Sequence, residues 1–156
     1  MTTMRLMLMW LLLVAVAWPQ SLASRLEQLI EQRVNDLRTE HHLGQLESQV
    51  AMADAARQHS ADMAERDFFD HRSPVAGRTL PWDRLRVHGV VFSACAENLF
   101  WSEGLTLEAV AEQTVQGWLN SPGHRVNMMN PRYRWMGTGV EQRQRSYWVT
   151  QVYATP

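Results

Sequence analysis

The segment from Trp118 to Pro131 places a histidine in the first turn of a short predicted helix. Ser121 suits the N-cap of that helix, Pro122 suits its first position, and Asn130-Pro131 ends it. His124 then lies at the helix N-terminus, where the helix dipole lowers the pKa of an imidazole and keeps the ring neutral. Because a metal ion requires a neutral imidazole, the spacing makes His124 a candidate metal ligand.

Two other polar side chains are candidates for the same site. His71 lies in the polar loop Asp70–Pro74, directly after Phe68-Phe69, and we expect both phenylalanines to be buried and to anchor this loop. Glu97 follows a predicted strand end. Two imidazoles and one carboxylate suit zinc or a similar divalent ion, with the remaining position open to water, or Glu97 stands off the metal as a general base. The structural alternative is a polar network that joins three segments of the chain.

The three segments Asp70–Pro74, Ala96–Leu99 and Trp118–Pro131, in this order, resemble the CAP superfamily of cysteine-rich secretory proteins, antigen 5 and pathogenesis-related 1 proteins. The resemblance runs from about residue 26 to residue 153 and is greatest to the short bacterial members, of the SCP-domain type. In that family two histidines and one or two glutamates line a cleft, which in several members holds a divalent metal. The resemblance assigns three of these positions to His71, Glu97 and His124.

One cleft position departs from the family pattern. Many eukaryotic members carry a second glutamate where this chain has Asn120-Ser121, so an activity that needs two carboxylates is not implied. The leading hypothesis is a metal-capable cleft, hydrolytic if Glu97 is a catalytic residue. Some members bind sterols or fatty acids, which makes an apolar ligand the second hypothesis, with candidate wall residues Phe100, Trp101 and Met128. The third is an envelope or secreted interaction protein whose three polar residues are only structural.

The N-terminal residues 1–23 are predicted to be a secretory signal peptide. Arg5 precedes an apolar run from Leu6 to Trp18, and Ser21-Leu22-Ala23 forms a small-residue cleavage motif. The run is too short to cross a bilayer as a mature helix. We therefore expect a secreted or periplasmic protein of one domain, residues 24–156, with no permanent membrane span after cleavage.

The composition excludes several function classes. All 15 basic residues are arginines, and the absence of lysine removes Ser-Lys dyads, Schiff-base chemistry and the phosphate-binding loop. The formal net charge of −1 does not favour nucleic acid as a partner. The sequence leaves open whether the ligand is a small molecule, a peptide or a lipid. The single cysteine, Cys95, cannot form an internal disulfide, and we expect a small buried thiol there.

Helices that surround a small sheet predict an α+β fold, and the resemblance sharpens this to a three-layer α-β-α sandwich with a small antiparallel sheet. The first helix should begin at a capping box, Ser24 to Glu27, and end before Gly44. His59, on the second helix, is predicted to be a structural histidine between helices. The last two strands flank a polar turn and should pair as a hairpin. The other predicted elements are helices at 48–66, 79–88 and from Thr106, and strands at 90–94, 135–140 and 147–154.

Overall fold

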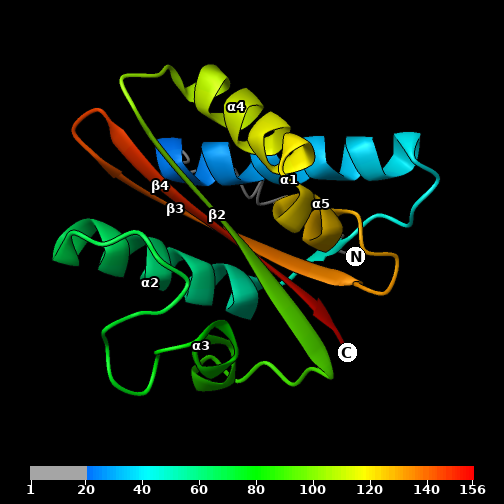
Figure 1. Cartoon of the computed structure of the whole chain (residues 1–156), viewed down its shortest axis with the longest axis horizontal. Coiled ribbons are helices and arrows are strands. Elements are labelled where there is room, and N and C mark those ends of the chain that lie inside the picture. Colours follow the sequence, from blue (N-terminus) through cyan, green and yellow to red (C-terminus); the bar gives the residue numbers. More distant parts are fainter. Residues whose placement is uncertain (1–20) are drawn as a thin grey trace, which may run out of the picture.

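The computed structural model describes residues 21–156, which form five helices and a four-stranded sheet in an α+β arrangement. Helices α1, α4 and α5 cover one face of the sheet, and α2 and α3 cover the other, so the three predicted layers are confirmed (Figure 1). The helices are α1 (Leu22–Glu40), α2 (Val50–Arg66), α3 (Pro81–Val87), α4 (Leu107–Asn120) and α5 (Pro122–Met128). The strands are β1 (Glu47–Ser48), β2 (Ala94–Glu103), β3 (Trp135–Arg143) and β4 (Ser146–Thr155).

The strand order β1-β3-β4-β2 leaves β2 at one edge of the sheet. The predicted hairpin is confirmed, because β3 and β4 pair antiparallel from Trp135 opposite Ala154 onward. β2 pairs antiparallel with β4 over its whole length, whereas the short β1 pairs parallel with β3. The strand predicted at 90–94 was wrong: β2 begins at Ala94 and carries Glu97 in its interior rather than after its end.

Helix α1 begins earlier than its predicted capping box. Ser21 is the N-cap, and its hydroxyl accepts a hydrogen bond from the backbone N–H of Ser24 at 3.1 Å. The predicted box fails because the Glu27 carboxylate turns inward to Arg57, with an O···N distance of 2.7 Å. Residues 1–20 of the predicted signal peptide lie outside the described residues. Within residues 21–156, no helix is long and apolar enough to cross a membrane.

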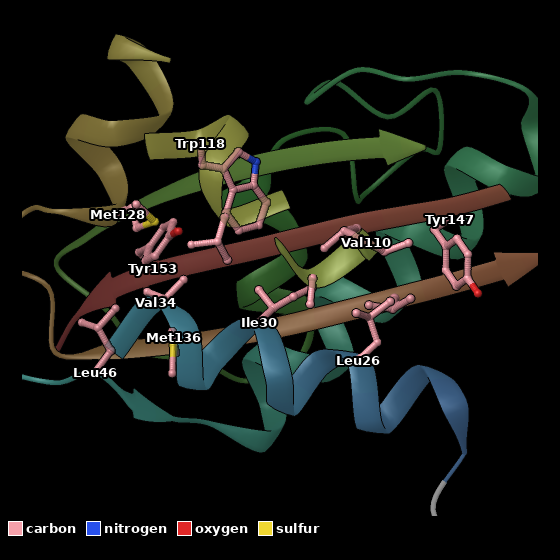
Figure 2. Close-up of a cluster of buried hydrophobic side chains, with 14 of the residues drawn as sticks. Leu26, Ile30, Val34, Leu46, Val110, Trp118, Met128, Met136, Tyr147 and Tyr153 are labelled. Atoms are coloured by element: carbon pink, nitrogen blue, oxygen red, sulfur yellow. The ribbon is translucent and has the colours of Figure 1, made fainter. Parts of the chain in front are cut away.

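A large core fills the space between the sheet and helices α1, α4 and α5 (Figure 2). Leu26, Ile30 and Val34 recur on one stripe of α1, at the spacing that an amphipathic helix requires, and all three are fully buried. Trp118 of α4 packs into the same core, and its indole Nε1–H donates to the Leu99 carbonyl of β2 at 2.9 Å. This contact ties α4, and through it α5, to the edge strand that carries Glu97.

The opposite face is a smaller core under α2 and α3. Here α2 lies directly on β3, because Gly137 and Gly139 present no side chain to the helix. A Cβ added to Gly139 would lie 2.0 Å from the backbone nitrogen of Arg57, and one added to Gly137 would lie 2.3 Å from that of Ala53. The two glycines therefore set how closely α2 approaches the sheet.

Candidate functional site

The candidate site lies at the edge strand β2, where chain segments from the two helical layers approach each other. Glu97 is on β2 itself, His71 is in the segment between α2 and α3, and His124 is on α5. α3 lies on one side of β2 and α5 lies on the other (Figure 1). The three residues singled out from the sequence thus come from the edge strand itself and from two chain segments, one on each side of it.

Glu97 is buried, with both carboxylate oxygens engaged. Arg84 of α3 donates to Oε2 from Nη2 at 2.6 Å, and His71 Nδ1 lies 2.9 Å from Oε1. Only about 1% of the Glu97 side chain and 2% of the Arg84 side chain are exposed, so this ion pair is shielded from water. Because a carboxylate can only accept, His71 Nδ1 must carry the proton of its hydrogen bond.

Arg84 is a site residue that the sequence reasoning missed. Its guanidinium also donates to the carbonyl oxygens of His71 at 3.2 Å, Arg78 at 3.2 Å and Thr79 at 3.3 Å. A single side chain therefore fixes the backbone of the segment before α3 as well as the Glu97 carboxylate. No sequence signal pointed to it, because an arginine in a short helix is ordinarily solvent-exposed.

His59, predicted to be a structural histidine between helices, lies next to the site. It is fully buried on α2, its Nε2 lies 3.0 Å from the Asp70 carbonyl, and the same atom is 3.9 Å from Glu97 Oε1. Burial lowers the pKa of His59 to about 4, so the ring is neutral near pH 7 and Nε2–H donates to Asp70. His59 thus holds the segment that carries His71 to helix α2, through its hydrogen bond to the Asp70 carbonyl.

The two phenylalanines before His71 differ in burial. Phe68 is half-buried and packs on the His59 ring, with 5.9 Å between ring centroids. Phe69 is 52% exposed, so the prediction that both are buried was wrong for Phe69. The left-handed backbone at Asp67 redirects the chain as α2 ends, and Phe69 then lies at the surface.

His124 lies in the first turn of α5, as predicted from the sequence, and is half-buried. Burial lowers its pKa, and the nearby His71 lowers it further. Ser121 is the N-cap residue, but its hydroxyl does not cap the backbone; it lies 3.0 Å from His124 Nδ1. Asn98 of β2 holds this turn by donating from Nδ2 to the His124 carbonyl at 3.0 Å.

The two candidate histidines share one hydrogen-bonding pattern. Neither Nε2 atom of His71 and His124 has a hydrogen-bond partner among residues 21–156, whereas both Nδ1 atoms are held by a protein group. A second group that holds one imidazole nitrogen while the other faces a metal is the usual arrangement around zinc. Within the same range, no group of three or more His, Cys, Asp or Glu side chains is placed to hold an ion.

The predicted apolar wall residues do not share one surface. Met128 is fully buried in the large core, so its assignment to a ligand wall was wrong. Phe100 and Trp101 do line a groove of about 580 Å³, together with Trp148 and Phe69.

Cys95 is half-buried rather than buried, and burial raises its pKa, which disfavours the thiolate.

Comparison with known proteins identifies the family. The model of the Cysteine-rich secretory protein family (CAP) matches residues 31–153. YkwD of Bacillus subtilis (strain 168) is 30% identical over 131 residues, which cover 84% of this chain and 48% of YkwD. The membrane protein YlbC of the same organism is 34% identical over 117 residues, covering 75% of this chain and 32% of YlbC. The chain therefore spans about half or less of the length of these relatives.

Solved structures show the same fold. An extracellular protein containing an SCP domain from Bacillus anthracis str. Ames has a TM-score of 0.75 at 30% identity, and the match covers 90% of this chain and 45% of that one. An outer surface protein from Borrelia burgdorferi has a TM-score of 0.72 at 19% identity, over 84% and 92% of the two chains. NaASP2, solved with Zn2+, has a TM-score of 0.63 at 16% identity, over 88% and 83%. With the family model spanning most of its length and these folds matching its own, the chain belongs to the CAP family.

Proposed function

We propose that this CAP domain is an extracytoplasmic module that binds a divalent metal ion, zinc first, through Nε2 of His71 and Nε2 of His124. The observation that carries the proposal is the pair of imidazoles whose Nδ1 atoms are held by Glu97 and Ser121 while their Nε2 atoms have no partner within residues 21–156. The lowered pKa of His124 favours the neutral ring that a metal needs. A bound divalent ion would supply a Lewis acid at this edge of the sheet.

Glu97 acts in this proposal as a positioning residue. Both of its oxygens are engaged, Oε2 by Arg84 and Oε1 by His71, so neither is placed to accept a proton from a water molecule. The hydrogen bond to His71 instead fixes the tautomer of that ring and directs Nε2 outward. These contacts favour metal binding over hydrolysis with Glu97 as the general base.

An extracytoplasmic location is supported by the relatives and by the predicted signal peptide. The Bacillus anthracis protein is described as extracellular and the Borrelia burgdorferi protein as an outer surface protein. The apolar run before Ser21-Leu22-Ala23 has the length and the cleavage motif of a secretory signal. We propose that export delivers the domain to the periplasm or to the medium.

Zinc titration of the metal-free protein by calorimetry tests the metal site. We expect one site, weakened at least about tenfold in His71→Ala and in His124→Ala, because each change removes a ligand. His41→Ala, which alters an exposed histidine at the end of α1, is the matched control and should bind zinc normally. Wild-type affinity in both His71→Ala and His124→Ala would place any zinc elsewhere.

Binding of an apolar ligand is a second candidate function, carried by the groove at Phe100 and Trp101. Trp101 is 46% exposed and Phe69 is 52% exposed, so large apolar surfaces at this groove face solvent. The groove adjoins the His71 segment, since Phe68 and Phe69 lead directly into Asp70 and His71. A ligand there would lie beside the histidines without needing a metal.

A further inference from the structure

The groove beside the His71 segment is walled by aromatic rings from three places in the chain. Trp101 on β2 and Trp148 on β4 are directly paired across the two strands, so their side chains project from the same face of the sheet. Phe68 and Phe69 come from the turn after α2. Aromatic faces carry negative partial charge and attract a cation placed over them.

The charged side chain that lines the groove is also negative. Asp67 is the one charged residue that lines it within residues 21–156. Asp67 is also the C-cap of the 17-residue helix α2, whose C-terminal end carries the negative part of the helix dipole. A carboxylate, a helix C-terminus and several aromatic rings therefore line or border the groove, and each of these groups can attract a positive ligand.

The same lining disfavours other apolar ligands. A fatty acid or a phospholipid headgroup needs a cationic side chain for its carboxylate or phosphate, and none lines the groove in the described part of the chain. Arg66, which precedes Asp67, is exposed and does not line the groove either. Charge complementarity thus separates a cationic ligand from the anionic lipids.

We propose that this groove binds a free organic cation, a small quaternary ammonium compound, between Trp101, Trp148 and Asp67. Tetraalkylammonium groups have no N–H to donate, so their recognition depends on aromatic faces and on a nearby negative charge. The inference rests on the second candidate function, since it specifies the chemistry of the groove's ligand. It does not depend on the metal site.

Titration with choline and with 3,3-dimethylbutan-1-ol, its uncharged carbon analogue, tests the proposal. The two molecules have nearly the same shape, so a difference in affinity reports the positive charge. We expect choline to shift the indole N–H signals of Trp101 and Trp148 in NMR spectra and to bind at least about fivefold more tightly than the alcohol. Equal affinity would overturn the cation proposal while supporting an apolar-ligand groove, and binding of neither compound would overturn both.

Two variants and one control assign the site. Trp101→Leu keeps an apolar side chain but removes the aromatic face, and should weaken choline binding about fivefold or more. Asp67→Asn should weaken it too, and asparagine tolerates the left-handed backbone there (φ 54°). Trp82→Leu, which changes another half-exposed tryptophan on α3, should leave choline binding unchanged.

Phosphatidylcholine vesicles distinguish a headgroup from a free ligand. We expect no co-sedimentation of the protein with these vesicles, because the groove offers no cation to the lipid phosphate. Co-sedimentation that Trp101→Leu abolishes would overturn the proposal of a free ligand. Zinc titration of Trp101→Leu should match that of the wild type, so the groove and the metal site are tested separately.

Discussion

Glu97 is the residue on which the site is organised. A buried carboxylate is tolerated only when its charge is compensated and its oxygens are hydrogen-bonded, and Arg84 and His71 supply both conditions. The backbone carbonyl of Glu97 also accepts from Asn127 Nδ2 of α5 at 3.3 Å. One residue of β2 thus contacts the helical layers on both faces of the sheet.

Replacing Glu97 with glutamine should destabilise the protein by about 3 kcal/mol, because it leaves the Arg84 charge buried without its counter-ion. Glu65→Gln, which breaks an exposed ion pair with Arg143, is the control and should cost less than about 1 kcal/mol. Urea denaturation of both variants measures the free energies of unfolding. A Glu97→Gln loss no larger than the control's would show that the buried pair is energetically unimportant.

His59 makes the stability depend on pH. Its pKa is about 4 in the folded protein and about 6.5 in the unfolded chain, so between these values the unfolded chain binds the extra proton. Stability should therefore be lost as the pH falls from about 6.5 to 4, by about 3 kcal/mol from this residue. Above pH 6.5 both states are neutral at His59 and the contribution is constant.

Urea melts between pH 4.5 and 7 check the His59 prediction. The slope of unfolding free energy against pH reports how many more protons the unfolded chain binds than the folded protein. In His59→Met, which removes the titrating ring, this number should fall by close to one. His42→Met, at an exposed histidine, is the control and should leave the slope unchanged. An unchanged slope in His59→Met would mean that the buried histidine does not cause the pH dependence of stability.

At the scale of elements, the contact between α2 and β3 positions His59 and the turn that leads to His71. Alanine at position 139 would bring a methyl group into the α2 backbone near Ala56 and Arg57. Backbone cannot move aside as a side chain can, so we expect Gly139→Ala to destabilise the protein by about 3 kcal/mol.

A thermal or urea melt measures this effect. Gly44→Ala is the matched control, because its added Cβ meets no atom within 4 Å, and it should change stability by less than about 0.5 kcal/mol. Similar melts for Gly139→Ala and Gly44→Ala would show that α2 can shift away from β3 at little cost.

The edge position of β2 has a second consequence at this scale. Edge strands expose backbone groups that can pair with another chain. Here Trp118 of α4 occupies the Leu99 carbonyl and Asn127 of α5 occupies the Glu97 carbonyl. Side chains of α4 and α5 therefore occupy two carbonyls in the part of β2 near His71 and His124. These carbonyls are not available to pair with another strand.

At the scale of the molecule, His71 and His124 come from the two helical layers on opposite faces of the sheet. They are brought near each other where these layers meet at the edge strand β2. The His71 segment is held to the α2 and α3 layer by Arg84 and His59. His124 lies on α5 in the other layer and is held to the sheet through Asn98 of β2, whose Nδ2 also donates to the buried Tyr153 hydroxyl at 3.2 Å. Neither layer alone would hold both rings in place.

We expect export of the whole protein to remove residues 1–23 and to leave Ser24 as the N-terminus. Such cleavage would remove the Ser21 cap of α1 but keep its buried residues Leu26, Ile30 and Val34, so the domain should still fold. Mass spectrometry of the protein from the native host measures the terminus. An intact Met1 in membrane fractions would instead indicate an anchored protein.

The sequence by itself determined the features that depend on neighbouring residues. The short helix that carries His124, the start of α4 at Thr106 and the β3–β4 hairpin follow from caps, turns and apolar spacing within a few positions. The family also followed from the sequence, because its recognition rests on three short segments whose residue types and order suffice.

Tertiary structure alone decided how the site is assembled. The interior placement of Glu97 and Asn98 in β2 breaks the apolar pattern of a strand. It is stabilised by partners from other segments: Arg84 and His71 for Glu97, and Tyr153 and residues of α5 for Asn98. Arg84 and His59 are far from Glu97 along the chain, so no local propensity pairs them with it. Burial turns these distant polar groups into partners, because each would be costly to bury without the others.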